Sequence, residues 1–133
     1  YRRMDTAIQT LLNNKELPNS SLWVPINEEA NRIMNIPNMD DRYLIIYSDL
    51  VENSDWLSLY RKYQAPKEAL ISYIEEHIEL QDLKGLNIIV RYIPKTVEDN
   101  QRFRKVYAVF KSVFEKHGAQ VMHDFPSAIN IKP

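Results

Sequence analysis

The most apolar segment of this sequence is followed directly by a carboxylate. Residues 43–47 read Tyr-Leu-Ile-Ile-Tyr, and Ser48 and Asp49 come next. A carboxylate at the end of a buried strand can ligate a hard cation, accept a phosphoryl group or act as a base. It can also cap the following turn by accepting hydrogen bonds from backbone amides, as most such aspartates do. Asp49 is the first candidate for chemistry, and both interpretations stay open.

Other candidate side chains also follow predicted strands. Glu52 and Asn53 lie just beyond Asp49, and Thr96 follows the end of a second apolar run. Ligands of open parallel sheets bind beyond the carboxyl ends of the strands, so these residues, with Asp49, are candidates for partner binding. Trp56 is a further candidate because large aromatic side chains often anchor protein partners. The alternative, that its aromatic segment packs in the core, is the more common arrangement.

Several other chemistries lack the residues or the spacing that they need. No cysteine is present, no glycine-rich turn follows an apolar run, and His77, His117 and His123 have no metal or triad spacing. A formal net charge of -1 gives no field that attracts nucleic acid or an anionic membrane. No apolar run is long enough to cross a bilayer. We therefore expect a soluble protein that binds neither nucleic acid nor membrane. The lack of cysteine does not separate the cytoplasm from the periplasm, so the compartment stays open, with the cytoplasm favoured.

The hydrophobic pattern predicts the elements that position these residues. Three apolar runs, at 43–47, 86–93 and 119–125, predict strands, and the unbroken first run is typical of a parallel strand buried on both faces. Apolar residues at helical spacing predict helices between these strands. Further helical spacing predicts two N-terminal helices, over 4–12 and 26–34.

These elements predict a single α/β domain over residues 1–133. Right-handed crossovers would place the two intervening helices on one face of the sheet and leave the N-terminal helices to cover the other. The expected fold is a three-layer, Rossmann-like sandwich with a small parallel sheet of about three strands. The strand at 43–47 is too apolar for an edge. We therefore expect a neighbouring strand upstream of Tyr1, or pairing of the exposed sheet edge with another molecule.

The order of several short motifs resembles the C-terminal half of a von Willebrand factor type A domain, most closely bacterial members of unassigned role. The motifs are Ser20-Ser21 before a helix, Leu44 to Asp49, Leu83 to Leu86, and Phe110 to Ala119. The resemblance implies a protein-binding module with a metal-ion-dependent adhesion site. Asp49 would match the acidic ligand of that site, and Ser21, or less closely Ser20, would match a hydroxyl ligand.

The sequence departs from this family at its first strand, whose Asp-x-Ser-x-Ser loop has no counterpart here. Asp5-Thr6 is no substitute, because the neighbouring apolar spacing is helical. One carboxylate and one hydroxyl leave most coordination positions around Mg²⁺ to water. We therefore expect no cofactor in this chain, with Mg²⁺ bound only if a longer parent protein supplies the loop.

The expected function is that of a non-enzymatic protein-interaction module with at most a partial metal site. The alternative is a receiver-like or other α/β enzyme fragment, in which Asp49 is the phosphoacceptor or the catalytic acid. Lys95 would match the lysine of a receiver, but the acidic pair that a receiver needs is missing.

Overall fold

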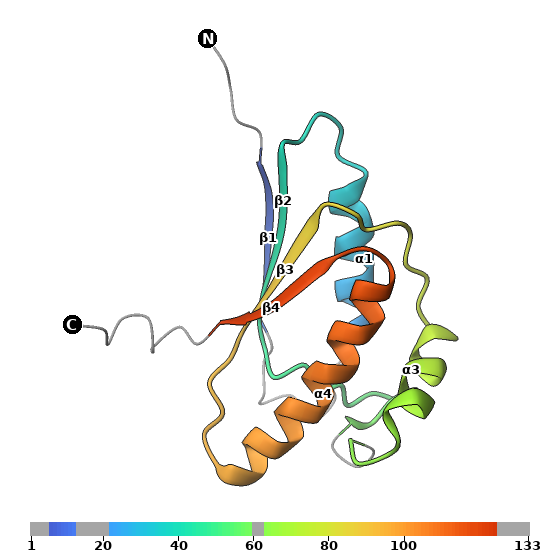
Figure 1. The fold of residues 1–133 in the computed structure, drawn as a ribbon, viewed down its shortest axis with the longest axis vertical. Helices are drawn as coiled ribbons and strands as arrows, with labels where there is room; N and C mark the ends of the chain where they lie inside the picture. The colour runs from blue at the N-terminus through green and yellow to red at the C-terminus, as the bar shows by residue number, and fades with distance from the viewer. Residues whose placement is uncertain (1–5, 13–21, 60–62, 125–133) are drawn as a thin grey trace, which may run out of the picture.

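Strands and helices alternate along the chain in the computed structural model, which describes residues 6–12, 22–59 and 63–124. Within these residues the elements are, in order, β1 (Thr6–Leu12), α1 (Trp23–Met34), β2 (Asp41–Tyr47), α3 (Lys67–Glu75), β3 (Leu86–Arg91), α4 (Val97–Lys116) and β4 (Gln120–Asp124) (Figure 1). The predicted α/β class, with a small parallel sheet and interleaved helices, is confirmed.

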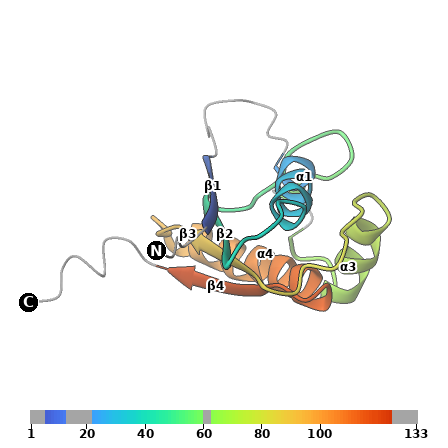
Figure 2. The same ribbon diagram turned by 90° about the horizontal axis from the view of Figure 1, so that it is seen from above.

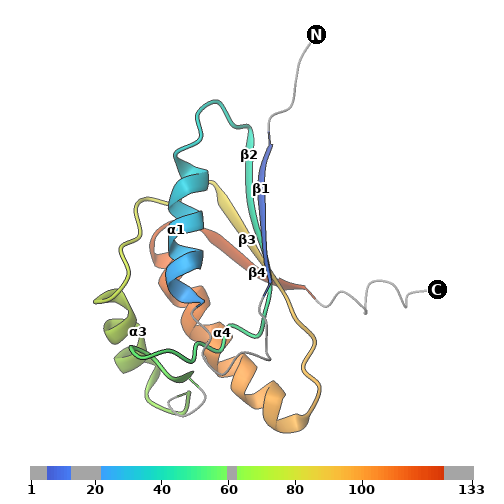
Figure 3. The ribbon, with the colours of Figure 1, turned by 180° about the vertical axis from the view of Figure 1, so that it is seen from behind.

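The described strands form one parallel sheet in the order β1-β2-β3-β4. Each strand therefore lies beside the strand that precedes it in the sequence, and the sheet grows in one direction from β1 to β4. Because crossovers between parallel strands are right-handed, all three described helices must lie on the same face. Figures 2 and 3 show α1, α3 and α4 together on one side of the sheet.

The first segment is a strand, so its prediction as a helix was wrong. Strand β1 pairs along its whole length with β2, from Thr6 opposite Asp41 to Leu12 opposite Tyr47. The apolar residues of this segment fit a helical period, but pairing with a neighbouring strand overrides a weak local preference. The neighbour that β2 required is therefore β1 itself, and the described sheet has four strands instead of three.

The layers also differ from the expected arrangement, because α1 connects β1 to β2 and lies on the same face as α4. The rings of Trp23 in α1 and Phe110 in α4 are 5.3 Å apart. No helix of the described residues covers the opposite face, which we call the open face. In β3, buried Ile88 alternates with Ile89, which faces the open side and is half-buried. The described part of the chain thus has two layers.

The core lies between the sheet and the helices. The longest helix, α4, buries one face against it through Phe103, Val106, Val109, Phe110, Val113 and Phe114. The end of this helix is fixed by Gly118, which has a φ of 107°. A Cβ there would lie 2.9 Å from the backbone nitrogen of Lys84. Gly118 therefore ends α4 in a left-handed conformation and sets the start of β4.

Candidate functional site

The loop after β2 buries the first predicted site residue, Asp49. Asp49 Oδ1 accepts a hydrogen bond from the Val51 N–H at 3.0 Å, and Ser48 Oγ accepts one from the Leu50 N–H at 2.9 Å. These turns hold Leu50 at a φ of 64°. The carboxylate of Asp49 therefore helps to cap the turn, and its metal-binding role stays a prediction. Ser21, the other predicted metal ligand, and Ser20 lie outside the described residues.

Glu52 caps a helix that is distant in the sequence. Its side chain is fully buried, and Oε1 accepts hydrogen bonds from the N–H groups of Leu22 at 2.6 Å and Trp23 at 2.8 Å. Leu22 is the N-cap of α1 and makes no side-chain cap of its own. The partial positive charge at the start of α1 stabilises the carboxylate. Oε2 has no hydrogen-bond partner within the described residues.

The other predicted partner-binding residues also make contacts within the fold. Asn53 Oδ1 accepts a hydrogen bond from the Ser58 hydroxyl at 3.2 Å. Trp56 is half-buried, and its ring stacks 4.9 Å from that of His77. Thr96 is the N-cap of α4 and accepts a hydrogen bond from the Asp99 N–H at 2.9 Å. The binding roles proposed for these residues remain predictions.

Within the described residues, the carboxyl edge of the sheet lacks the usual ligand crevice of an α/β protein. Such a crevice forms where the strand order reverses, and the described order β1-β2-β3-β4 never reverses. At this edge the backbone N–H groups of Val51 and Leu22 donate hydrogen bonds to the carboxylates of Asp49 and Glu52. Backbone N–H groups at such positions favour an anion and not a cation. The described residues contain no group of three or more His, Asp or Glu side chains that could hold a metal ion.

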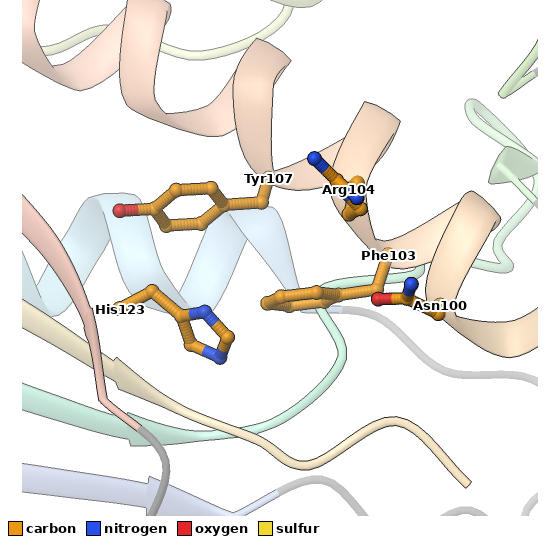
Figure 4. A pocket seen from close by; sticks show the side chains of 5 residues that line it. All are labelled: Asn100, Phe103, Arg104, Tyr107 and His123. Atoms are coloured by element: carbon orange, nitrogen blue, oxygen red, sulfur yellow. The ribbon is translucent and has the colours of Figure 1, made fainter.

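A pocket that the sequence analysis missed lies between α4 and β4. Its volume is about 500 Å³, and it is lined by Asn100, Phe103, Arg104, Tyr107 and His123 (Figure 4). The first four residues recur at spacings of three and four and so share one side of α4. His123 completes the lining from β4. The helical spacing was visible in the sequence, but the contact with His123 across the fold was not.

The pocket combines aromatic rings with a positive charge. The ring of His123 lies 4.7 Å from that of Phe103 and 5.6 Å from that of Tyr107. His123 Nε2 is 2.8 Å from the carbonyl oxygen of Tyr92. Because a carbonyl only accepts, this nitrogen carries a proton. Burial raises the pKa of the Tyr107 phenol, so it stays protonated at neutral pH. Arg104 is exposed and forms no ion pair within the described residues.

The open face carries a row of apolar side chains across three strands. Ile45, Ile89 and Met122 are neighbours in the register of β2, β3 and β4. Met122 is 50% exposed. Beside this row, Arg91 donates a hydrogen bond to the Tyr47 hydroxyl at 3.0 Å and lies 3.1 Å from a carboxylate oxygen of Asp124. The open face is therefore apolar at its centre, and Arg91 and Asp124 neutralise each other at its side.

The outer edge of β4 is bonded to side chains of α4. The Val121 N–H donates to Glu115 Oε2 at 3.2 Å, and the Val121 carbonyl accepts from Lys111 Nζ at 2.9 Å. Lys111 and Glu115 also pair with each other at 3.0 Å. The hydrogen bond from Lys111 lowers the pKa of the Glu115 carboxyl. We call this arrangement the Lys111–Glu115 clamp; it occupies backbone groups that an added strand would need.

Comparisons with models of protein families, with curated proteins and with solved structures found no match to this chain. Among the described helices, none combines the length and the apolar character that crossing a membrane requires.

Proposed function

We propose that this chain is a non-enzymatic protein-interaction module that binds a protein partner on the open face of its sheet. The observation that carries the proposal is the partly exposed row Ile45, Ile89 and Met122 on a parallel sheet. Parallel sheets are almost always covered on both faces, because their strands are apolar on both sides. A partner that covers this row would remove apolar surface from water.

The best-fitting partner element is an amphipathic helix. Helices are the elements that cover parallel sheets, and their apolar stripe would lie along the central row. The neighbouring polar side chains carry little net charge, because Arg91 pairs with Asp124. The open face would therefore select its partner by apolar contact and shape more than by charge.

We also propose that this domain is similar to von Willebrand factor type A domains. The similarity is supported by the alternation of parallel strands with helices and by the position of Asp49 directly after β2. Strand β1 is followed by Asn13, Asn14 and Lys15, so the family's Asp-x-Ser-x-Ser metal loop is still missing. We therefore propose recognition that does not depend on a metal ion. No described contact favours the receiver-like alternative, because Asp49 is buried and caps a turn.

The test measures binding of fluorescently labelled amphipathic helical peptides by anisotropy, for the unaltered chain and two variants. Met122→Lys places a charge on the open face and should weaken binding by about tenfold or more. Val97→Lys is the matched control, because Val97 is 76% exposed at the start of α4 and lies outside the sheet. It should change the affinity by less than about twofold.

Two outcomes would contradict the proposal. One is that no peptide of the panel binds the unaltered chain. The other is that Val97→Lys weakens binding as much as Met122→Lys does. Thermal melts of both variants should match that of the unaltered chain, so that a change in affinity reports on the surface and not on the fold.

A further inference from the structure

We propose that the pocket between α4 and β4 binds a small aromatic carboxylate. The pocket is separate from the open face. Side chains alternate along β4, so His123 points to the same side as buried Val121, towards α4, while Met122 points to the open face. The proposed site therefore does not depend on the protein partner proposed above.

The walls of the pocket suit a flat ring. Its volume of about 500 Å³ lies within the range of about 300–1,000 Å³ that is usual for ligand pockets. Figure 4 shows the ring of His123 turned towards the rings of Phe103 and Tyr107. A planar ligand can stack on these faces or meet their edges.

These walls are held in place before any ligand binds. Phe103 is buried and packs 5.1 Å from the ring of Tyr92. The same Tyr92 accepts a hydrogen bond from His123 through its carbonyl oxygen. A ligand ring would therefore have few side chains to order, which lowers the entropy cost of binding.

The charge of the pocket favours an anion. Arg104 supplies a planar guanidinium that can bind both oxygens of a carboxylate. Its neighbour Arg102 is already paired with Glu98 at 3.5 Å, whereas Arg104 has no ion pair among the described residues. Asn100, one turn earlier on the same side of α4, adds an amide donor. The residues that line the pocket include no carboxylate, so a cationic ligand would meet repulsion without compensation.

The phenol of Tyr107 supports this ligand class. Because it is protonated at neutral pH, it lines the pocket without adding negative charge. Figure 4 shows its hydroxyl turned away from Arg104 and Asn100, so a ligand beside those residues would meet the ring of Tyr107. The site then has three parts, which are aromatic walls, the cation of Arg104 and the neutral amide donor of Asn100. An aromatic carboxylate is the simplest ligand that uses all three.

The experiment titrates the full chain with 4-hydroxybenzoate and with 4-hydroxybenzamide, its neutral analogue, and follows binding by protein NMR. We expect the carboxylate to bind at least about tenfold more tightly than the amide, because only the carboxylate pairs with Arg104. The signals of Asn100 and His123 should shift with the same affinity. Met122 faces the other side of the sheet, and its signal should stay unchanged.

The matched variants are Arg104→Gln and Lys105→Gln, which remove adjacent exposed cations of α4. Lys105 does not line this pocket. We expect Arg104→Gln to weaken carboxylate binding by about tenfold, and Lys105→Gln to change it by less than about twofold. The proposal is overturned if the unaltered chain does not bind the carboxylate, if it binds the amide equally well, or if the two variants behave alike.

Discussion

Two groups of polar side chains lie near the carboxyl ends of the strands, and the fold uses them in opposite ways. In the loop after β2, the carboxylates of Asp49 and Glu52 are buried and accept hydrogen bonds from backbone N–H groups. In the pocket between α4 and β4, Arg104 is exposed beside aromatic rings. In this fold a charged side chain beside a helix start or a tight turn stabilises the backbone, whereas a charged side chain at the rim of a pocket stays available for a ligand.

The largest expected contrast between the two regions is in stability. Glu52→Ala removes a buried acceptor and leaves two N–H groups at the start of α1 without a partner. It should lower the free energy of unfolding by about 2–4 kcal/mol, whereas Arg104→Gln should change it by less than about 0.5 kcal/mol. Urea denaturation of both variants measures the difference. Glu28→Ala is the control, because it removes an exposed acid from the same helix.

A smaller effect separates the two interpretations of Asp49. Asp49→Ala should lower the free energy of unfolding by about 1–2 kcal/mol, because the Val51 N–H loses its acceptor. Asp49→Asn keeps an acceptor oxygen and should cost less than about 1 kcal/mol. Thermal melts with and without excess MgCl₂ provide the check. A rise in the melting temperature with Mg²⁺ that Asp49→Asn abolishes would show instead that this region binds a metal.

The smallest effect concerns pH and the Lys111–Glu115 clamp. The lowered pKa of Glu115 means that its contribution is fully present above the ordinary glutamate pKa and is lost as the pH falls through the lowered value. Because the side chain is 39% exposed, solvent screening limits this contribution to about 0.5 kcal/mol. Urea denaturation between about pH 5 and pH 3 should show a shallower loss for Glu115→Gln than for the unaltered chain. Equal slopes would mean that the clamp adds nothing measurable.

Most of the fold could be predicted from the hydrophobic pattern, because the strands β2 and β3 and the helix α4 have strong local signals. Strand β1 could not be. Ile8, Leu11 and Leu12 fit a helix as well as a strand, and only pairing with β2 decides between them. The open face was not predicted for the same reason, because a helix over residues 4–12 was expected to help cover that face of the sheet.

The site was harder to predict, because the decisive contacts join residues that are far apart in the sequence. Glu52 was correctly placed after a strand, but its bonds to Leu22 and Trp23 span 30 and 29 residues. The pocket needs the packing of His123 on Phe103, which local spacing does not contain. A sequence indicates which side chains can carry charge, and the tertiary structure decides whether backbone amides or solvent will surround them.

The bonding of Val121 to α4 also limits how copies of this chain could join. Open-ended growth into a fibre requires the β4 edge of one molecule to meet the β1 edge of the next. Lys111 and Glu115 already bond to the outward carbonyl and N–H of Val121. Pairing of another strand with β4 is therefore blocked at this residue. Strand β1 is the other edge of the described sheet, and joining two β1 edges would produce a closed pair with no site for a third copy.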